Sequence, residues 1–344
     1  MMKSFNELKE AKTVGSDYKL IILSAHDEQD PNTTAVLLKA TAKKLGIECY
    51  LCDFDGLYLS TENGKDYINT FEVDKDGIVI TPTLKSDDID YIDPIEIDPK
   101  NTLILLRGLG HSGVTSKGSY TNVSNELTYK GYTLINSVAC HEICSDKDNN
   151  QSYFERNNLV TPKTVRVSHQ HLQVQAFDRL GVDFPIIMKT ARGSQGVGVL
   201  LIDSMKSLLA TGQLVNKLAP FEDVLIQEYI KSKYDVRVIV CGGEIMGAMK
   251  RPVVDGDFRS NVAQGSTPEV FECTQKEQEE CIRAAKVVDG QLVGVDFIPA
   301  TDRDKGDPIF IEVNSSPGLN GINEVVKDIV KNILLKLKDR SIWS

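Results

Sequence analysis

The sequence lacks several features that would place it in a specialised class of protein. None of its apolar runs approaches the length of a membrane span, and residues 1–10 are polar with mixed charge, unlike a signal peptide. Basic residues are in deficit, because 39 Lys and Arg face 49 Asp and Glu and leave a net charge of −10. A general nucleic-acid-binding surface needs the opposite balance. We therefore expect a cytoplasmic protein that binds neither membranes nor nucleic acids in general.

Cysteine is too scarce and too irregular for a disulfide framework. Seven cysteines in 344 residues are an odd count in a chain that is not small, so reduced thiols are expected. Cys49 and Cys52 have the spacing of a redox pair, but they fall in a strand-like run where buried thiols are ordinary. The cluster Cys140-His141-Glu142-Ile143-Cys144 looks like half of a zinc site. No second cluster with matching spacing completes four ligands.

The first part of the chain alternates strands and helices in the way that is typical of a parallel sheet. Residues 17–140 are therefore predicted to form one open parallel α/β domain, after an extension at 1–16. An acidic, β-prone segment at about 56–100 interrupts the alternation. The elements are predicted at 19–23 (strand), 33–45 (helix), and 47–53, 102–106 and 133–136 (strands).

Beyond residue 140 the pattern changes to strands, hairpin turns and helices typical of α+β structure. Gly242 and Gly243 mark a tight hairpin between two apolar runs. The helices are predicted at 146–158, 170–180, 274–288 and 322–337, with another beginning at 205. The strands are predicted at 184–189, 197–202, 224–230, 236–241 and 244–250, and in the two halves of 293–313.

The most informative stretch lies at 294–318, where two apolar runs flank a polar turn centred near Asp304. Glu312 and Asn314 are two residues apart, so on a strand they share a face. In a hairpin with this turn, Asp296 lies opposite Glu312 and points the same way. Facing carboxylates repel each other, and oxygen ligands suit Mg²⁺ or Mn²⁺, so a divalent cation site is predicted. A solvated acidic hairpin face is the alternative.

A glycine-rich turn at 190–198 follows Lys189 and separates two predicted strands. It is not a P-loop, because no Gly-Lys-Ser/Thr sequence follows, and it is not a dinucleotide fingerprint, because a strand follows it rather than a helix. Such a turn can fold over phosphates with its backbone N–H groups, and Lys189 can add a mobile positive charge. A plain hairpin that contains glycines is the alternative.

Three cations, Lys250, Arg251 and Arg259, stand out in an acidic chain and are predicted on a loop between a strand and a helix. There they can neutralise phosphates, and Arg259 can hold a terminal phosphate or an acyl phosphate in a bidentate manner. A solvated loop is the alternative. Upstream, the end of a strand at Glu228 and Tyr229 can present backbone groups to an adenine edge.

These segments occur in an order that resembles the ATP-grasp superfamily and is most similar to the RimK-type peptide and amino-acid ligases. The resemblance covers about 145–325 and rests on the combination of motifs, whereas the N-terminal domain matches only loosely. The matching motifs are Met188-Lys189 with Gly193–Gly198, Gln227–Ile230, Asp257–Asn261, Gly294–Asp296 and Glu312–Ile322.

The resemblance implies a parallel α/β domain followed by an ATP-grasp fold of two subdomains, at 141–220 with a glycine-rich lid and at 221–344 with the metal site, that clamps ATP. It implies two Mg²⁺ or Mn²⁺ ions that bridge the phosphates and are held by Asp296, Glu312 and Asn314. The residues implied to contact the nucleotide are Lys147, Lys189, Gly193, Ser194, Gln195, Gly196, Gln227, Glu228, Tyr229, Asp235 (facing the ribose), Arg259, Ser260 and Asn261. Catalytic roles are implied for Arg259, Lys250 and Arg251. For Lys250 and Arg251 two roles stay open, contact with ATP and contact with the substrate.

The resemblance also implies an activity: a ligase that forms ADP and an acyl phosphate, and adds an amino acid such as glutamate to a peptide or protein C-terminus. Two alternatives stay open, a small-molecule ligase similar to glutathione synthetase and a synapsin-like ATP-binding regulator without ligase activity. Arg107, at a strand end, is a candidate for binding a substrate carboxylate, with a structural ion pair as the alternative. The sequence identifies neither substrate, nor whether addition repeats, nor whether the chain forms a homo-oligomer.

Overall fold

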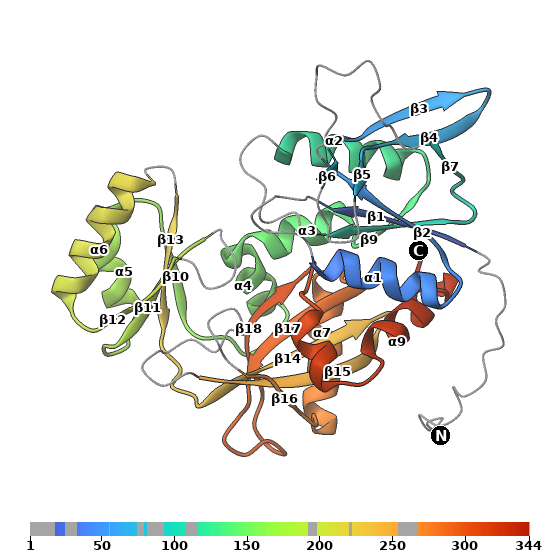
Figure 1. Cartoon of the computed structure of the whole chain (residues 1–344). Coiled ribbons are helices and arrows are strands. Elements are labelled where there is room, and N and C mark those ends of the chain that lie inside the picture. Colours follow the sequence, from blue (N-terminus) through green and yellow to red (C-terminus); the bar gives the residue numbers. More distant parts are fainter. Residues whose placement is uncertain are drawn as a thin grey trace. The chain divides into compact units, whose positions relative to one another are not determined.

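The computed structural model describes residues 18–24, 33–54, 56–73, 79–80, 93–107, 116–191, 198–219, 222–253 and 267–343. The chain divides into two compact units, residues 1–135 with 330–344 and residues 136–329. Figure 1 shows the elements of both units. The predicted boundaries after residues 16, 140 and 220 divide the chain more finely and stay a prediction.

The first unit is built on a parallel sheet, as the strand and helix pattern predicts. Its elements are β1 (Lys19–Ser24), α1 (Thr33–Lys44), β2 (Glu48–Asp53), β8 (Thr102–Arg107), α2 (Ser116–Tyr129) and β9 (Thr133–Ile135). The strand order is β2-β1-β8-β9, and each neighbouring pair is parallel. β8 is buried at every position, as a nearly continuous apolar run predicts for a central parallel strand.

The acidic segment of the first unit forms small antiparallel sheets in the residues that the structure describes. Its strands are β3 (Tyr58–Glu62), β4 (Lys65–Asn69), β5 (Glu72–Val73), β6 (Val79–Ile80) and β7 (Ile95–Ile97). Asn63 and Gly64 connect β3 to β4 with φ of 51° and 78°, the left-handed pair that a tight hairpin needs. Asp66 accepts hydrogen bonds from Lys130 Nζ (2.7 Å) and Tyr132 Oη (3.1 Å). These bonds tie the acidic segment to the residues that lead into β9.

The last residues of the chain belong to the first unit and pack against its N-terminal elements. Tyr18 Oη donates to the Leu334 carbonyl (3.4 Å), and the rings of Tyr18 and Trp343 meet edge to face with centroids 5.6 Å apart. Thr133 Oγ1 donates to the Trp343 carbonyl at 2.8 Å. A short 3₁₀ turn, η4 (Arg340–Ile342), precedes Trp343.

The single C-terminal helix predicted over 322–337 is wrong. The structure has two helices there, α8 (Asn320–Val325) and α9 (Ile329–Lys336). Val326 is extended, with φ of −105° and ψ of 106°, and Asp328 has φ of 59°. Left-handed backbone at a non-glycine residue cannot continue an α-helix. The apolar spacing continues across the break, so the pattern alone does not reveal it.

The second unit contains two antiparallel sheets, and the first has the order β10-β13-β11-β12. Its elements are β10 (Thr164–Val167), η2 (Gln170–Leu172), α5 (Gln173–Leu180), β11 (Ile186–Thr190), β12 (Val199–Ile202), α6 (Met205–Leu218) and β13 (Val224–Glu228). The helices α5 and α6 cover one face of this sheet (Figure 1), and a core that includes Ala176, Leu208 and Ile226 joins them to it. The strands β11 and β12 flank the predicted glycine-rich turn.

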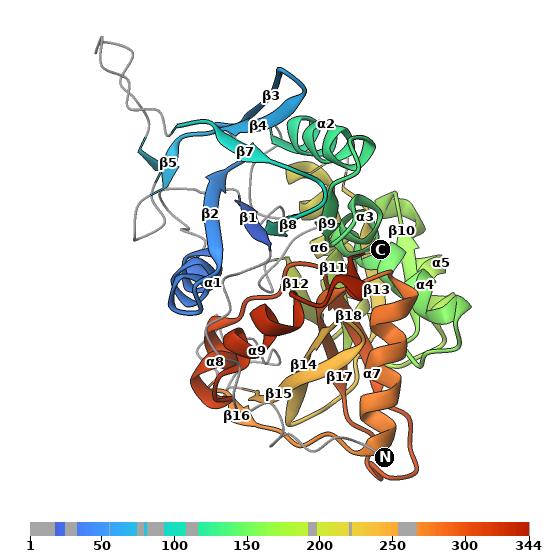
Figure 2. The same cartoon turned by 90° about the vertical axis from the view of Figure 1, so that its right-hand side faces the viewer.

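The second sheet has the order β16-β15-β14-β17-β18. Its elements are β14 (Tyr234–Cys241), β15 (Glu244–Pro252), β16 (Glu269–Val270), α7 (Gln275–Val287), β17 (Leu292–Ile298) and β18 (Ile309–Asn314). Gly242 and Gly243 have φ of 55° and 74°, which confirms the predicted tight hairpin between β14 and β15. The helix α7 packs on β14, β15 and β17 (Figure 2).

Two further helices of the second unit, α3 (Val138–Ser145) and α4 (Lys147–Arg156), pack against β18. Cys140 and Phe154 enter the core of the five-stranded sheet, where Phe154 contacts Phe310 with ring centroids 5.7 Å apart. The sequence predicts α4 but not α3. The helix α3 carries the cluster Cys140–Cys144. Its position against the sheet therefore explains these residues by packing.

The cysteines behave as expected, since all seven are free thiols. Burial raises the pKa of Cys49 to about 12 and that of Cys52 still further, so neither is a reactive thiolate. Within the described ranges, no group of three or more His, Cys, Asp or Glu residues is placed to hold a metal ion.

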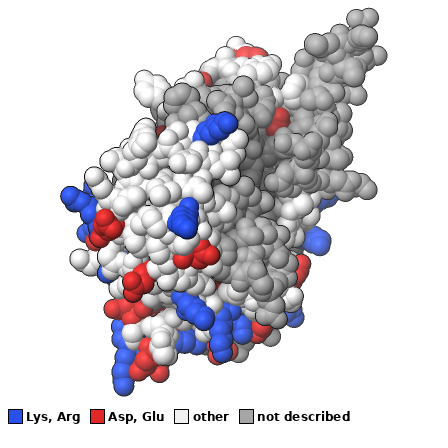
Figure 3. All heavy atoms as spheres, turned by 90° about the vertical axis from the view of Figure 1, so that its left-hand side faces the viewer, with Lys and Arg blue, Asp and Glu red and all other residues white. Residues whose placement is uncertain are grey.

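The surface carries charges of both signs. On the face drawn in Figure 3, Lys and Arg side chains lie beside Asp and Glu side chains. Among the described residues, no helix is both long and apolar enough to cross a bilayer.

Candidate active site

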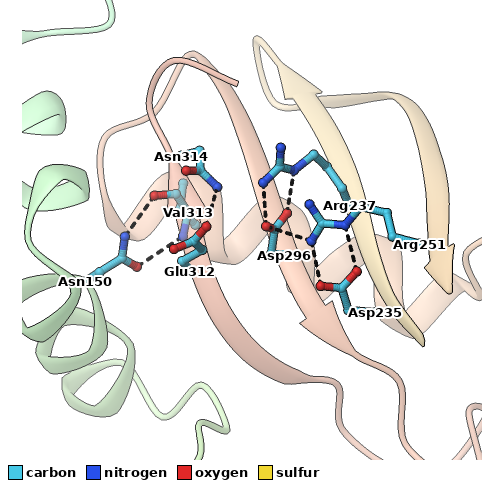
Figure 4. Close-up of polar contacts among 8 residues, drawn as sticks. All are labelled: Asn150, Asp235, Arg237, Arg251, Asp296, Glu312, Val313 and Asn314. Atoms are coloured by element: carbon cyan, nitrogen blue, oxygen red, sulfur yellow. Dashed lines mark hydrogen bonds and ion pairs between the residues drawn. The ribbon is translucent and has the colours of Figure 1, made fainter. Parts of the chain in front are cut away.

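The hairpin of β17 and β18 brings the predicted metal ligands together. Asp296 pairs in register with Glu312, and Gly294 pairs with Asn314, which confirms the predicted geometry (Figure 4). Glu312 and Asn314 lie two apart on β18, and Asn314 Nδ2 donates to Glu312 Oε1 at 3.1 Å. A cluster of oxygen donors therefore lies on two neighbouring strands.

Two arginines hold the Asp296 carboxylate. Arg237 on β14 donates from Nε to Oδ1 (2.7 Å) and from Nη2 to Oδ2 (2.6 Å). Arg251 on β15 donates from Nη2 to Oδ2 of Asp296 (2.9 Å) and binds Asp235 through Nε and Nη2, both at 2.7 Å. Burial opposes ionisation of Asp296, but the charges of Arg237 and Arg251 outweigh it and lower the pKa of this carboxyl. Asp296 is thus an anion held rigidly in the sheet.

Polar side chains from α3, α4 and the preceding loop fix the end of β18. Asn150 binds the backbone of Val313, donating from Nδ2 to the carbonyl (2.9 Å) and accepting from the N–H at Oδ1 (3.2 Å). Asn136 Nδ2 donates to the Ser315 carbonyl at 2.6 Å, and His141 Nδ1 lies 2.8 Å from Ser315 Oγ. The residues on either side of Asn314 are therefore held by side chains distant in sequence.

Two lysines lie close enough to Glu312 to be coupled to it electrostatically. Burial lowers the pKa of Lys147, at the start of α4, while Glu312 and Asp146 oppose the shift. Burial also lowers the pKa of Lys189, on β11, to about 8; Glu312 opposes this shift and Lys147 adds to it. Such paired cations beside a carboxylate are suited to binding a polyanion and its metal ion.

An amide relay holds Lys189 in place. Lys189 Nζ donates to Gln227 Oε1 at 3.0 Å, and Gln227 Nε2 donates to Gln151 Oε1 (3.0 Å) and Thr164 Oγ1 (2.6 Å). Gln151 Nε2 in turn donates to the Pro162 carbonyl at 2.7 Å. The relay therefore runs from β11 through β13 to α4.

The remaining predicted residues of the second unit lie on the strands that flank this cluster. Glu228 ends β13, where its N–H donates to the Lys163 carbonyl (2.9 Å) and its Oε2 accepts from the Lys163 N–H (3.2 Å). Tyr229 follows directly and is half-buried. Asp235 on β14 lies opposite Arg251.

Lys250 and Arg251 both lie within β15, so the prediction of a loop for these cations is wrong; Lys250 ends the strand predicted at 244–250, and the strand continues through Arg251. β15 continues to Pro252, pairing with β14 throughout and with β16 at Lys250 and Glu269. Lys250 Nζ forms an ion pair with Glu269 (2.8 Å) and lies 5.4 Å from the centroid of the Tyr234 ring. Arg251 is buried among carboxylates, whereas Lys250 is partly exposed.

Several predicted residues cannot be placed beside this cluster. Gly193, Ser194, Gln195, Gly196, Arg259, Ser260 and Asn261 lie outside the described residues. Arg107 belongs to the first unit, at the carboxyl end of β8 and in register with Ser24 on β1. Its side chain is buried, and burial lowers its pKa to about 10.

The donor set fits a hard divalent cation. Carboxylate and amide oxygens are the ligands that Mg²⁺ and Mn²⁺ prefer, and each carboxylate oxygen can accept more than one partner. Glu312 is the more available carboxylate, because two arginines already bind Asp296. Asn314, whose Nδ2 binds Glu312, would add its amide oxygen to this donor set.

Three residues that shape this cluster were given no role from the sequence: Arg237, Asn150 and Gln151. Arg237 lies two residues beyond Asp235, so on a strand the two share a face, and this spacing is a signal that was available. Asn150 and Gln151 gave no usable signal, because their partners come from separate segments of the chain.

Sequence comparisons agree with this arrangement. The model of the RimK-like ATP-grasp domain family matches residues 144–337. The probable alpha-L-glutamate ligase of Marinomonas sp. (strain MWYL1) is 32% identical over 218 residues, which cover 63% of this chain and 70% of that protein. The protein of the same name from Coxiella burnetii (strain Dugway 5J108-111) is 30% identical over 223 residues, 64% of this chain and 72% of that protein.

Solved structures share the fold over most of the chain. D-cycloserine synthetase DcsG has a TM-score of 0.65 at 12% identity and covers 93% of this chain and 99% of its own. The ATP-grasp ligase PsnB, complexed with a phosphomimetic variant of its minimal precursor, Mg and ADP, has a TM-score of 0.63 at 18% identity, with 95% and 99% covered. Since the family model matches more than half of its residues, the chain belongs to the RimK-like ATP-grasp family and is a ligase that uses ATP and Mg²⁺ and forms ADP.

Proposed function

We propose that this ligase activates a carboxylate with ATP and joins it to an amine, adding an amino acid such as glutamate to the C-terminus of a peptide or protein. Two relatives carry the name probable alpha-L-glutamate ligase, and PsnB was solved with a precursor peptide. The observation that carries the proposal is geometric: Asp296 and Glu312 face each other on β17 and β18, and the buried Lys189 is held by Gln227 at 3.0 Å.

The chemistry needs activation because a carboxylate is a poor electrophile. A substrate carboxylate oxygen bonds to the γ-phosphorus of ATP while the bond to the β,γ-bridging oxygen breaks, which yields an acyl phosphate and ADP. The amine then attacks the carbonyl carbon and loses a proton, and phosphate leaves as the amide forms. Bound Mg²⁺ neutralises phosphate charge. No side chain forms a covalent bond, so positioning and electrostatics carry the catalysis.

The residue roles in this proposal are those that the resemblance to ATP-grasp ligases implies. Asp296, Glu312 and Asn314 hold two Mg²⁺ or Mn²⁺ ions, and Arg107 binds a substrate carboxylate. Arg259 contacts the transferred phosphoryl group, while Lys250 and Arg251 act nearby, Arg251 by holding Asp296. The other nucleotide contacts are Lys147, Lys189, Gly193, Ser194, Gln195, Gly196, Gln227, Glu228, Tyr229, Asp235, Ser260 and Asn261. The protein works in the cytoplasm.

Product analysis tests this proposal. The protein is incubated with ATP, Mg²⁺ and pooled amino acids, with and without candidate peptides, and ADP, phosphate and product masses are followed. ADP and phosphate that form only with a peptide, whose mass grows by one residue, are expected. Turnover with small amino compounds alone would favour a ligase similar to glutathione synthetase. AMP and pyrophosphate would contradict the acyl-phosphate route.

The pH dependence of ATP binding tests the role of Lys189. Its pKa is lowered to about 8 by burial, so the free protein increasingly carries a neutral amine above that pH, whereas ATP favours the ammonium form. Binding then requires uptake of a proton, and the Kd for ATP without metal is expected to rise above about pH 8, by up to about tenfold per pH unit.

The matched control is Lys189→Arg, which keeps its positive charge over this range. Its Kd is expected to change little between about pH 7 and about pH 9.5. Titration calorimetry at several pH values measures both profiles. A wild-type Kd that stays constant over the same range would contradict the assignment of Lys189 to the phosphates.

A further inference from the structure

We propose that Asn150 and Gln151, adjacent residues of α4, are two separate positioning residues. Asn150 fixes the position of β18, the strand that carries the metal ligands Glu312 and Asn314. Gln151 fixes the orientation of Lys189, which contacts the nucleotide. This inference rests on the proposed roles of Glu312, Asn314 and Lys189. Both amides are buried, with 1% and 7% of their surfaces exposed, and buried amides are stable only when their polar atoms are bonded.

Asn150 acts as a substitute for a neighbouring strand. β18 is an edge strand, since it lies at the end of the five-stranded sheet and pairs there with β17. The amide of Asn150 binds both the carbonyl and the N–H of Val313, as a paired peptide group would (Figure 4). Val313 lies between Glu312 and Asn314, so this contact fixes the backbone from which both ligands project.

Gln151 acts on a different strand. An amide nitrogen has two hydrogens, and Gln227 Nε2 uses them on Gln151 Oε1 (3.0 Å) and Thr164 Oγ1 (2.6 Å). The Gln227 oxygen must then face Lys189 Nζ, which it meets at 3.0 Å. Without the Gln151 acceptor, the Gln227 amide can rotate and turn its nitrogen toward the ammonium group. Gln151 therefore orients Lys189 through Gln227.

The two contacts predict opposite effects on two ligands. Loss of the Asn150 contact loosens β18 and leaves the Lys189 relay intact, so the metal ion is affected and the nucleotide is not. Loss of the Gln151 contact disturbs the Lys189 relay and leaves β18 in place, so the nucleotide is affected and the metal ion is not. A residue that serves only general stability would shift both affinities or neither.

The experiment measures both affinities separately in the whole protein. Mn²⁺ binding is followed by the free-ion EPR signal without nucleotide, and ATP binding by calorimetry with EDTA. Asn150→Ala is expected to weaken Mn²⁺ binding by about 10–100-fold, as is usual for residues that orient metal ligands. Gln151→Met is expected to weaken ATP binding by about tenfold, the equivalent of one hydrogen bond. In each variant the other affinity stays within about twofold.

Two controls separate failure of this inference from failure of the proposed site. Asn149→Ala changes an exposed amide on the same helix and is expected to leave both affinities unchanged. Glu312→Ala is expected to abolish Mn²⁺ binding, and retained binding would overturn the metal assignment itself. If Glu312→Ala loses Mn²⁺ while Asn150→Ala binds it like the wild type, only the positioning role is overturned.

Folding is the remaining concern, because Asn150→Ala leaves two buried backbone groups unbonded. If that variant does not fold, Asn150→Ser replaces it, since a hydroxyl can satisfy one of the two Val313 groups. The same selective loss of Mn²⁺ affinity is expected from Asn150→Ser. Wild-type Mn²⁺ binding in folded Asn150→Ser, or equal weakening of Mn²⁺ and ATP in any of these variants, would overturn the inference.

Discussion

Replacing Glu312 with Ala is expected to lower kcat for ATP turnover by at least about 10³-fold, because a metal ion supplies several kcal/mol of transition-state charge stabilisation and each 1.4 kcal/mol is tenfold in rate. Of the two facing carboxylates, Asp296 is bound by Arg237 and Arg251, whereas Glu312 is coupled to Lys147 and Lys189. Its removal therefore affects both the ion and the cations that meet the phosphates. A coupled assay for ADP measures the effect.

Two variants control this result. Glu312→Gln keeps the shape but not the charge, and is expected to lose nearly as much activity. Glu324→Ala removes an exposed carboxylate on α8, in the same unit, and is expected to keep wild-type turnover. Phosphate release by Glu312→Ala within about tenfold of the wild type would show that the metal site lies elsewhere.

Arg251→Met is expected to lower the free energy of unfolding by about 3–5 kcal/mol, since it removes one partner from a buried ionic network. Arg251 has 3% of its side chain exposed and binds both Asp235 and Asp296. Without it, Asp235 loses a bidentate partner, while Asp296 keeps its ion pair with Arg237. Urea unfolding followed by circular dichroism measures the change.

The neighbouring residue provides the control for this prediction. Lys250 lies next to Arg251 on the same strand, but its ion pair with Glu269 is exposed, with 28% and 56% of the two side chains accessible. Exposed pairs contribute up to about 1 kcal/mol, so Lys250→Met is expected to cost no more than that. Equal losses from the two substitutions would mean that the Asp235–Arg251–Asp296 network does not stabilise the sheet.

The hairpin of β17 and β18, which carries the proposed metal ligands, was predictable because the sequence signals for it are local. Two apolar runs, a polar turn and a spacing of two residues fix the strands, the turn and the shared face of Glu312 and Asn314. The parallel sheet of the first unit was predictable for the same reason, since its strands and helices alternate along the chain. The register of Asp296 with Glu312 follows from the centre of the turn.

The surroundings of the hairpin were not predictable, because they depend on which segments become neighbours. Facing carboxylates require a positive partner, and the sequence predicted a metal ion for that role. The structure adds Arg237 and Arg251 at Asp296, from strands that precede it by 59 and 45 residues. Such contacts depend on which strands become neighbours in the sheet. No short stretch of the sequence specifies that strand order.

The break between α8 and α9 shows a different limit. Apolar periodicity continues through Val326 and Asp328, so the pattern favours one helix, while the backbone of Asp328 is left-handed. Periodicity reports which residues are buried and not whether the backbone between them is helical. The two helices can therefore both face apolar surfaces although the chain turns between them.

Transfer of oxygen from the substrate to phosphate tests the proposed chemistry most directly. The accepting peptide is labelled with ¹⁸O in its C-terminal carboxylate and incubated with ATP, Mg²⁺ and glutamate, and the released phosphate is examined by mass spectrometry. Activation through an acyl phosphate predicts one ¹⁸O atom in each phosphate released, together with ADP. Unlabelled phosphate that accompanies amide formation would contradict it.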